Sequence, residues 1–292
     1  MKYALHTVSY SGTWPGQYAL PLEGAIKKAA GFGYKGVEIM AKRPHASVLD
    51  MDKARVKRVK KLLSDGNLEC ACIAGYTDFL LGAGTMVPSI EMQIAHVTRL
   101  AEMASDFGCG LVRVFTGYNV NGLSYLSQWG IVLDALRECA RRSAGLGVTI
   151  GLQNHHDIGA DTAGMLDLIA EIGEPNVKAM YDAWAPALQG ENLAEAVKAM
   201  APHIVYTTVA DYVKKPRWRH AGDAGFIRGD DIVRAVPMGE GVIAYAEFFN
   251  ALKSAGYDGW VSYEICSPVR GGGAESNLDL YAKQFLDYMA KF

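Results

Sequence analysis

The chain has 292 residues, half of them hydrophobic and 10% aromatic, with 31 acidic against 29 basic side chains. This composition supplies a large hydrophobic core and excludes disordered, collagen-like and low-complexity classes. A formal charge of −2 leaves no basic excess to hold a phosphate backbone, so we expect no nucleic-acid partner.

Neither a membrane span nor a secretory leader is predicted. No apolar run reaches the roughly 18 residues that cross a bilayer, and the opening MKYALHTVSYSG is too polar for a signal peptide. The five cysteines are odd in number, scattered and mostly inside apolar segments, which is typical of reduced thiols. We therefore expect a cytoplasmic protein with no membrane partner.

Short apolar runs alternate with longer amphipathic stretches along the whole chain. Strands are predicted at residues 3–10, 34–40, 68–75, 111–117, 148–155, 177–184, 204–211 and 259–266. Helices are predicted at residues 22–33, 52–66, 89–108, 126–147, 162–174, 192–202, 245–257 and 278–292.

Eight strand–helix units of this kind predict an α/β protein, a single (β/α)8 TIM barrel that forms one domain over residues 1–292. A doubly wound open sheet is the alternative. It is disfavoured because the segment after the first strand, SYSGTWPGQ, lacks the glycine-rich phosphate loop of that fold.

Two segments between the predicted elements are long: residues 211–238, after the seventh strand, and residues 267–277, after the eighth. Both are interpreted as loops. Because both leave the carboxyl ends of strands, where barrel active sites are assembled, we expect them to border the site.

Polar residues near the ends of the predicted strands are the candidate site residues. Alternate residues of a barrel strand face the lumen, and a polar side chain late in a strand is expected to point inward. This criterion selects His6, Glu38, Arg113, Gln153, His155, Asp182, Thr208 and Glu264. Alternatives stay open for two of them: Glu38 as the structural ion-pair partner of Arg113, and His6 as a hydrogen-bonded wall.

Four segments resemble the xylose isomerase-like barrels, the superfamily of sugar isomerases and epimerases that also contains endonuclease IV-type repair enzymes. They are GFGYKGVEIM, FGCGLVRVFTG, VKAMYDAW and, most specifically, VPMGEGVIAYAEFFNALKSAGYDGWVSYEI. The resemblance covers essentially the whole chain and implies an enzyme acting on a sugar or sugar derivative.

The resemblance also implies a divalent metal, Mn, Mg, Co or Zn, held by a glutamate, an aspartate, a histidine and a second glutamate on strands five to eight. Asp182 and Glu264 match this set, whereas Gln153 and Thr208 stand at the other two positions. A glutamine can lend a carbonyl oxygen to a cation but cannot take up a proton. We therefore expect a modified metal site of Asp182, Glu264, Gln153 and His155; the alternative is a barrel that works without a tightly bound metal.

The implied chemistry is proton transfer next to a carbonyl through an enediolate, as in sugar isomerases and epimerases. Glu264 is the expected base, His155 the candidate second base, and Gln153 the residue that departs from the usual pair. The expected substrate-binding residues are His6, Trp14, Glu38, Arg113, Trp184, Thr208, His220 and Arg270.

Other functions remain open. A dehydratase acting on a keto-sugar or inosose would use the same site, since a single carboxylate base suits elimination. A non-catalytic carbohydrate-binding barrel or partner subunit would explain the incomplete ligand set. A repair endonuclease is disfavoured, because its metal cluster needs many histidines. The resemblance is also compatible with a homo-oligomer.

Overall fold

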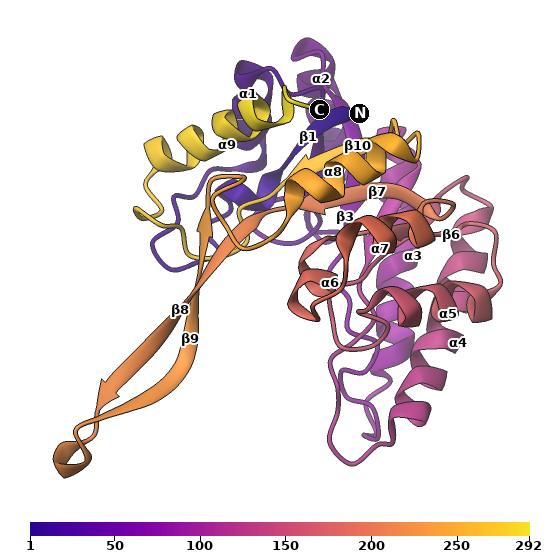
Figure 1. Cartoon of the computed structure of the whole chain (residues 1–292). Helices are drawn as coiled ribbons and strands as arrows, with labels where there is room; N and C mark the ends of the chain where they lie inside the picture. Colours follow the sequence, from indigo (N-terminus) through magenta and orange to yellow (C-terminus); the bar gives the residue numbers. More distant parts are fainter.

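In the computed structural model, which describes residues 1–292, eight parallel strands close into a barrel in the order β1-β10-β7-β6-β5-β4-β3-β2 (Figure 1). The barrel closes because β1 pairs with both β2 and β10. The strands are β1 (Lys2–His6), β2 (Gly36–Met40), β3 (Glu69–Ala74), β4 (Leu111–Val114), β5 (Thr149–Gln153), β6 (Val177–Met180), β7 (Ile204–Val209) and β10 (Trp260–Tyr263). The predicted (β/α)8 TIM barrel is confirmed.

Helices follow the strands as predicted, with one addition. They are α1 (Leu22–Phe32), α2 (Lys53–Asp65), α3 (Ser89–Phe107), α4 (Tyr125–Ala144), α5 (Thr162–Ile172), α6 (Trp184–Leu188), α7 (Leu193–Met200), α8 (Tyr245–Ser254) and α9 (Glu275–Met289). The short α6 lies at the end of the predicted sixth strand, which in fact stops at Met180. Residues Thr7–Tyr10, predicted as strand, form a 3-10 turn.

The strands are buried on both faces, because the lumen is filled on one side and the helices cover the other. All five residues of β2 are buried, and one hydrophobic cluster runs through both layers. Gly36 shows how tight the packing is: a Cβ there would lie 2.7 Å from the ring of Trp260. The close contact places Trp260 across the base of β2.

Residues 211–236 form an antiparallel hairpin, so the prediction of a loop in this segment is wrong. Strands β8 (Asp211–His220) and β9 (Phe226–Val236) pair from Asp211–Val236 out to His220–Phe226 and project away from the barrel (Figure 1). The ladder shifts register around Pro216, which has no N–H to donate. Proline and the run of charges conceal the alternation that marks a strand.

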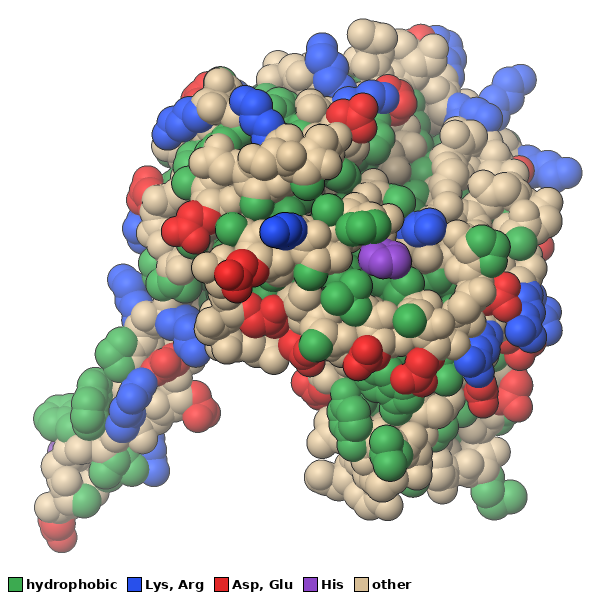
Figure 2. All heavy atoms as spheres, turned by 45° about the vertical axis from the view of Figure 1, so that its right-hand side comes forward, with side chains coloured by type: hydrophobic (Ala, Val, Ile, Leu, Met, Phe, Trp, Pro, Cys, Tyr) green, Lys and Arg blue, Asp and Glu red, His purple; other side chains and the backbone are tan.

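The hairpin is anchored to the barrel at its base and exposed to solvent at its tip. The buried carboxylate of Asp211 accepts the N–H groups of Gly239 and Gly241, at 2.9 and 2.8 Å. A Cβ on Gly241 would collide with that carboxylate, which explains the glycine. Towards the tip, Trp218 and Phe226 are exposed, and Figure 2 shows apolar and basic side chains gathered on the projecting arm.

None of the helices is long and apolar enough to cross a membrane. All five cysteines are free thiols.

A buried histidine couples the fold to pH. His45 is fully buried in the loop after β2, where one ring nitrogen contacts the Thr7 hydroxyl at 3.1 Å and the other the Leu20 carbonyl at 3.0 Å. Burial lowers the pKa of His45, although the Leu20 hydrogen bond and the nearby Glu23 oppose the shift. The folded protein therefore keeps this imidazole neutral at a pH where the unfolded chain binds a proton.

We predict that the free energy of unfolding falls as the pH drops below about 6.5, the ordinary histidine pKa, because the unfolded state then binds more protons. The variant His45→Gln should lose less stability than wild type between pH 7 and pH 5. Urea unfolding at both pH values measures the difference. Equal losses in the two proteins would contradict the assignment.

Candidate active site

A cavity of about 410 Å³ opens at the carboxyl ends of the barrel strands. Its wall comes from the segments that follow β1 to β5 and β10. The lining residues are Val8, Thr13, Trp14, Lys42, Tyr76, Thr77, Asp78, Leu81, Gln93, Arg113, Phe115, Tyr118, His155, His156, Glu264 and Cys266. This is the end of a (β/α)8 barrel at which active sites are built.

A buried ionic network forms beneath the cavity. The Arg113 guanidinium, on β4, lies 3.3 Å from a carboxylate oxygen of Glu38 and 3.3 Å from Nε2 of His6. The Thr208 hydroxyl donates to the other Glu38 oxygen at 3.2 Å. All four side chains are buried, as charged groups that pair in a protein interior require. The ion pair between Glu38 and Arg113 considered from the sequence is confirmed.

Burial governs the protonation of this network. Burial raises the pKa of Glu38, while Arg113 and the hydroxyl of Thr208 act in the opposite direction. Burial, together with the charge of Arg113, holds the pKa of His6 well below its ordinary value. Since Nδ1 of His6 accepts the Val8 N–H at 3.2 Å, the neutral ring carries its proton on Nε2, facing the carboxylates.

Two carboxylates line the cavity: Asp78, which accepts the N–H groups of Leu80 and Tyr118, and the more deeply buried Glu264. Glu264 directly follows β10, is only 6% exposed, and lies 3.9 Å from Nε2 of His6. Burial raises its pKa to about 8, with Glu38 and Asp182 adding to the shift and Arg113 opposing it. A carboxylate at the floor of a cavity, near a fixed cation, is the arrangement of a proton-transfer site.

Asp182 and Gln153 meet beside this floor. The Gln153 amide donates to one carboxylate oxygen of Asp182 at 3.1 Å, and the Trp184 N–H donates to the other at 2.7 Å. Asn154 exchanges two hydrogen bonds with the Asp182 backbone, at 2.9 and 2.7 Å. Desolvation raises the pKa of Asp182 to about 6. The carboxylate thus holds the ends of β5 and β6 together.

The metal site expected from the family resemblance is not assembled by these side chains. No group of three or more His, Cys, Asp and Glu side chains lies close enough to hold an ion. Gln153 Oε1 is a buried oxygen without a hydrogen-bond partner, but both Asp182 oxygens accept N–H groups and Thr208 is bonded to Glu38. With a glutamine and a threonine at two of the four positions, the donors do not fit the family's ion.

His155 lies on the cavity wall, away from Asp182. Its Nδ1 is 3.0 Å from Nδ1 of His156, and its ring packs 4.7 Å from that of Phe115. Desolvation by this wall and the charge of Arg113 lower the pKa of His155. The predicted role of His155 as a metal ligand has no support in this arrangement.

The remaining predicted substrate contacts divide into two groups. Trp14 lines the cavity. Trp184 packs instead against Tyr212, at 4.5 Å between rings, and is not part of the lining. His220 is exposed near the hairpin tip, and Arg270 pairs with Glu240 on the surface. The structure therefore does not bring Trp184, His220 and Arg270 to the cavity, because α6, the hairpin and the last loop lead elsewhere.

Several lining residues were not selected from the sequence. Lys42, Tyr76, Phe115 and Tyr118 follow the ends of β2, β3 and β4, which is the position that selected the polar candidates. The same positional rule, extended to aromatic and basic residues just beyond each strand, would have found them.

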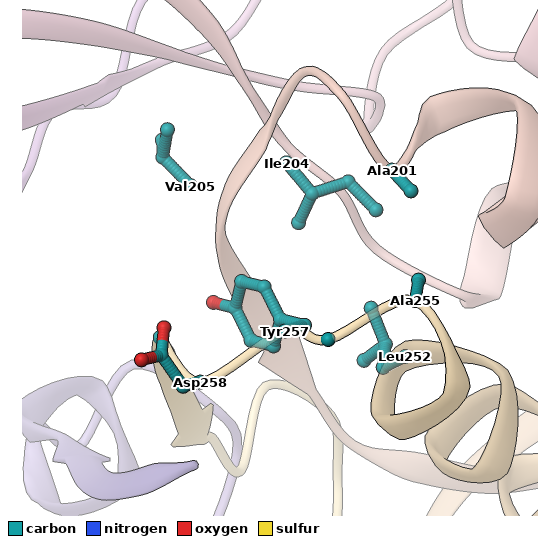
Figure 3. A pocket seen from close by; sticks show the side chains of 9 residues that line it. Ala201, Ile204, Val205, Leu252, Ala255, Tyr257 and Asp258 are labelled. Atoms are coloured by element: carbon teal, nitrogen blue, oxygen red, sulfur yellow. The ribbon is translucent and has the colours of Figure 1, made fainter.

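A second cavity, of about 330 Å³, lies at the opposite end of the barrel, near the starts of β7 and β10 (Figure 3). Ile204, Leu252 and Tyr257 contribute to its wall, and Asp258 is its one charged side chain. It offers neither a paired base nor a cation, so the cavity above Arg113 is the candidate active site.

The fold and the site define a (β/α)8 barrel enzyme with acid–base groups at the carboxyl ends of its strands. The family model described as xylose isomerase-like TIM barrel matches residues 26–290. The chain belongs to this family.

Similar proteins carry names of two reaction types. Fructoselysine 3-epimerase of Escherichia coli O157:H7 is 22% identical over 281 residues, covering 93% of this chain and 94% of the relative. Inosose dehydratase of Lacticaseibacillus casei is 23% identical over 288 residues, covering 91% and 88%. The structure of D-psicose 3-epimerase from Clostridium cellulolyticum H10 shares the fold, with TM-score 0.75, 16% identity and coverage of 100% and 99%.

These names agree with the predicted isomerase or epimerase class. The dehydratase alternative is represented among the relatives as well.

We predict that Gln153→Glu creates a site that needs a cation. The substitution places a carboxylate where an amide now donates to Asp182, so it should lower the free energy of unfolding by about 1–3 kcal/mol. Added Mn²⁺ should raise the melting temperature of this variant but not that of wild type. Calorimetry with and without Mn²⁺ measures both effects.

Gln93→Glu is the matched control, because Gln93 lines the same cavity without contacting Asp182. It should respond to Mn²⁺ as wild type does. An equal rise in the melting temperature of wild type would show that the native donors already bind the ion.

Proposed function

We propose that the protein is an isomerase- or epimerase-type enzyme that moves a proton next to the carbonyl of a keto-sugar. The observation that carries the proposal is that a buried carboxylate, Glu264, lines the same cavity as the fixed positive charge of Arg113, whose own ion pair is with Glu38. Proton abstraction beside a carbonyl requires both: a base for the C–H and a cation or donors for the developing oxyanion.

The step is a transfer of one proton. Glu264, in its ionised form, takes the proton from the carbon beside the carbonyl, and the C–H electron pair becomes the C=C bond of an enediolate. The negative charge that forms on the former carbonyl oxygen faces Arg113 and Lys42, the two cationic side chains of the cavity. Return of the proton from Glu264 to the former carbonyl carbon, with the hydroxyl proton of the neighbouring carbon passing to the former carbonyl oxygen, gives the isomeric carbonyl compound without an oxidant or reductant.

One base restricts the stereochemistry. Gln153 cannot accept a proton, Glu38 is held by Arg113 and Thr208, and the lowered pKa of His155 makes its imidazole a weak base. Transfer by Glu264 on one face of the substrate therefore fits isomerisation best. Two-base epimerisation would rely on His155 as the opposite partner.

A dehydratase is the second candidate. The same abstraction by Glu264 leads to loss of water when a hydroxyl group stands beyond the carbanion, and a single base suffices for it. The relative named inosose dehydratase supports this outcome.

No step is assigned to a metal ion, because the side chains found at the expected ligand positions do not fit the family's ion. The free thiols support a cytoplasmic location.

We predict that Glu264→Gln lowers the rate of proton exchange by about 10²–10⁴-fold, the usual contribution of a positioned acid–base group. Incorporation of solvent deuterium beside the carbonyl, followed by NMR over a panel of ketoses, keto-glucosides and inososes, measures the rate. Glu240→Gln, which alters an exposed carboxylate paired with Arg270, should retain the wild-type rate.

An unchanged rate in Glu264→Gln would remove this residue as the base. Absence of exchange by wild type on every compound in the panel would favour the non-catalytic binding barrel instead.

A further inference from the structure

The cavity has a polar inner end and an aromatic outer wall. Glu264, Arg113 and Lys42 lie at the inner end. Their ionisable groups are the ones that the proposed proton transfer uses. The outer wall is formed by three rings, Phe115, His156 and Tyr118. The two ends of the cavity therefore suit different parts of a ligand: a polar part at the inner end and an apolar part at the outer wall.

The three rings form one stack that leads from the ionic network to solvent. His156 stacks on Tyr118 at 3.9 Å and on Phe115 at 4.6 Å, with interplanar angles of 18° and 24°. The Arg113 guanidinium covers the Phe115 ring at 4.6 Å. Phe115 and His156 are buried, whereas Tyr118 is 53% exposed. The stack is fixed at its inner end and open at its outer end.

This wall presents neutral rings to the cavity, and the hydrogen-bonding groups beside them are partly engaged. Burial lowers the pKa of His156 to about 3, with His155 and Arg113 adding to the shift, so the ring is neutral at physiological pH. Nδ1 of His156 is engaged with Nδ1 of His155. Asp78, the acidic side chain beside Tyr118, is also engaged, because it accepts the N–H of Tyr118 at 3.3 Å.

Other apolar side chains extend the wall towards solvent. Leu81, in the segment after β3, is 59% exposed and lines the same cavity. Trp14 and the buried Val8, from the segment after β1, line the cavity as well. Large apolar side chains exposed at the mouth of a pocket are typical of a surface that a ligand covers. The faces of Phe115 and His156 are already covered within the stack, so Tyr118, the outer and exposed ring, is the one on which a flat apolar group can form an offset stack.

We propose that the substrate is a keto-glycoside with a planar aromatic aglycone, which stacks on Tyr118, the outer member of the ring stack, while the keto-sugar ring lies at Glu264 and Arg113. This inference rests on the proposed proton-transfer function for the position of the sugar. The aromatic subsite itself rests on the ring stack and the apolar mouth. It predicts that affinity depends on the aglycone even when the sugar carries no carbonyl and no reaction occurs.

The test compares binding of p-nitrophenyl glucoside and methyl glucoside, two inert probes that share the sugar and differ in the aglycone. Isothermal titration should show binding of the aryl glucoside by wild type at least about tenfold tighter than that of the methyl glucoside. Tyr118→Ala should remove about tenfold of the affinity for the aryl probe and leave that for the methyl probe unchanged.

Tyr125→Ala is the matched control, since Tyr125 is 51% exposed at the start of α4 and outside the cavity lining. It should bind both probes as wild type does. Equal affinities of wild type for the two probes, or no detectable binding of the aryl probe, would overturn the subsite. Equal weakening of both probes by Tyr118→Ala would place the sugar, not an aglycone, on the stack.

The two proposals fail separately. Tight binding of the aryl probe without deuterium exchange into any aryl keto-glucoside would retain the aromatic subsite and remove the proton-transfer function. Deuterium exchange into keto-sugars without tighter binding of the aryl glucoside would retain the proton-transfer function and remove the aromatic subsite.

Discussion

A positive charge buried in the lumen is the constraint on which the site depends. Transfer of the Arg113 guanidinium from water is costly unless charged and polar groups surround it. Glu38 accepts from it at 3.3 Å, the Gly75 carbonyl accepts from it, the rings of Tyr76 and Phe115 cover it, and the neutral ring of His6 lies beside it. The four strands β1 to β4 are therefore tied together at their carboxyl ends by one side chain.

The same charge organises the chemistry around it. It favours the ionised forms of Glu38 and Glu264 against burial and lowers the pKa values of His6 and His155. The imidazoles therefore stay neutral, whereas Glu264, with its pKa raised to about 8, gains its ionised, basic form as the pH rises towards 8. Where the family resemblance implies a metal ion to stabilise an oxyanion, this chain presents a guanidinium and an ammonium group instead.

The sequence predicted the barrel and its ionic floor because both follow from strand periodicity: Glu38, Arg113 and Glu264 stand late in their strands, with inward parity. It did not predict the hairpin, since Pro216 and the surrounding charges mask the strand pattern. Trp184, His220 and Arg270 were misplaced for a physical reason as well. The direction of a segment beyond a strand depends on its own structure, such as the turn into α6 or the ladder of β8 and β9.

We propose that fixed protein cations, rather than a bound metal ion, stabilise the enediolate. The most direct test of this proposal is deuterium incorporation into a keto-sugar by wild-type protein dialysed against a chelator, measured before and after addition of Mn²⁺, Co²⁺ or Zn²⁺. The account predicts that the rate survives chelation and does not rise when the ions are added. A rate that vanishes on chelation and returns with one of these ions would contradict it.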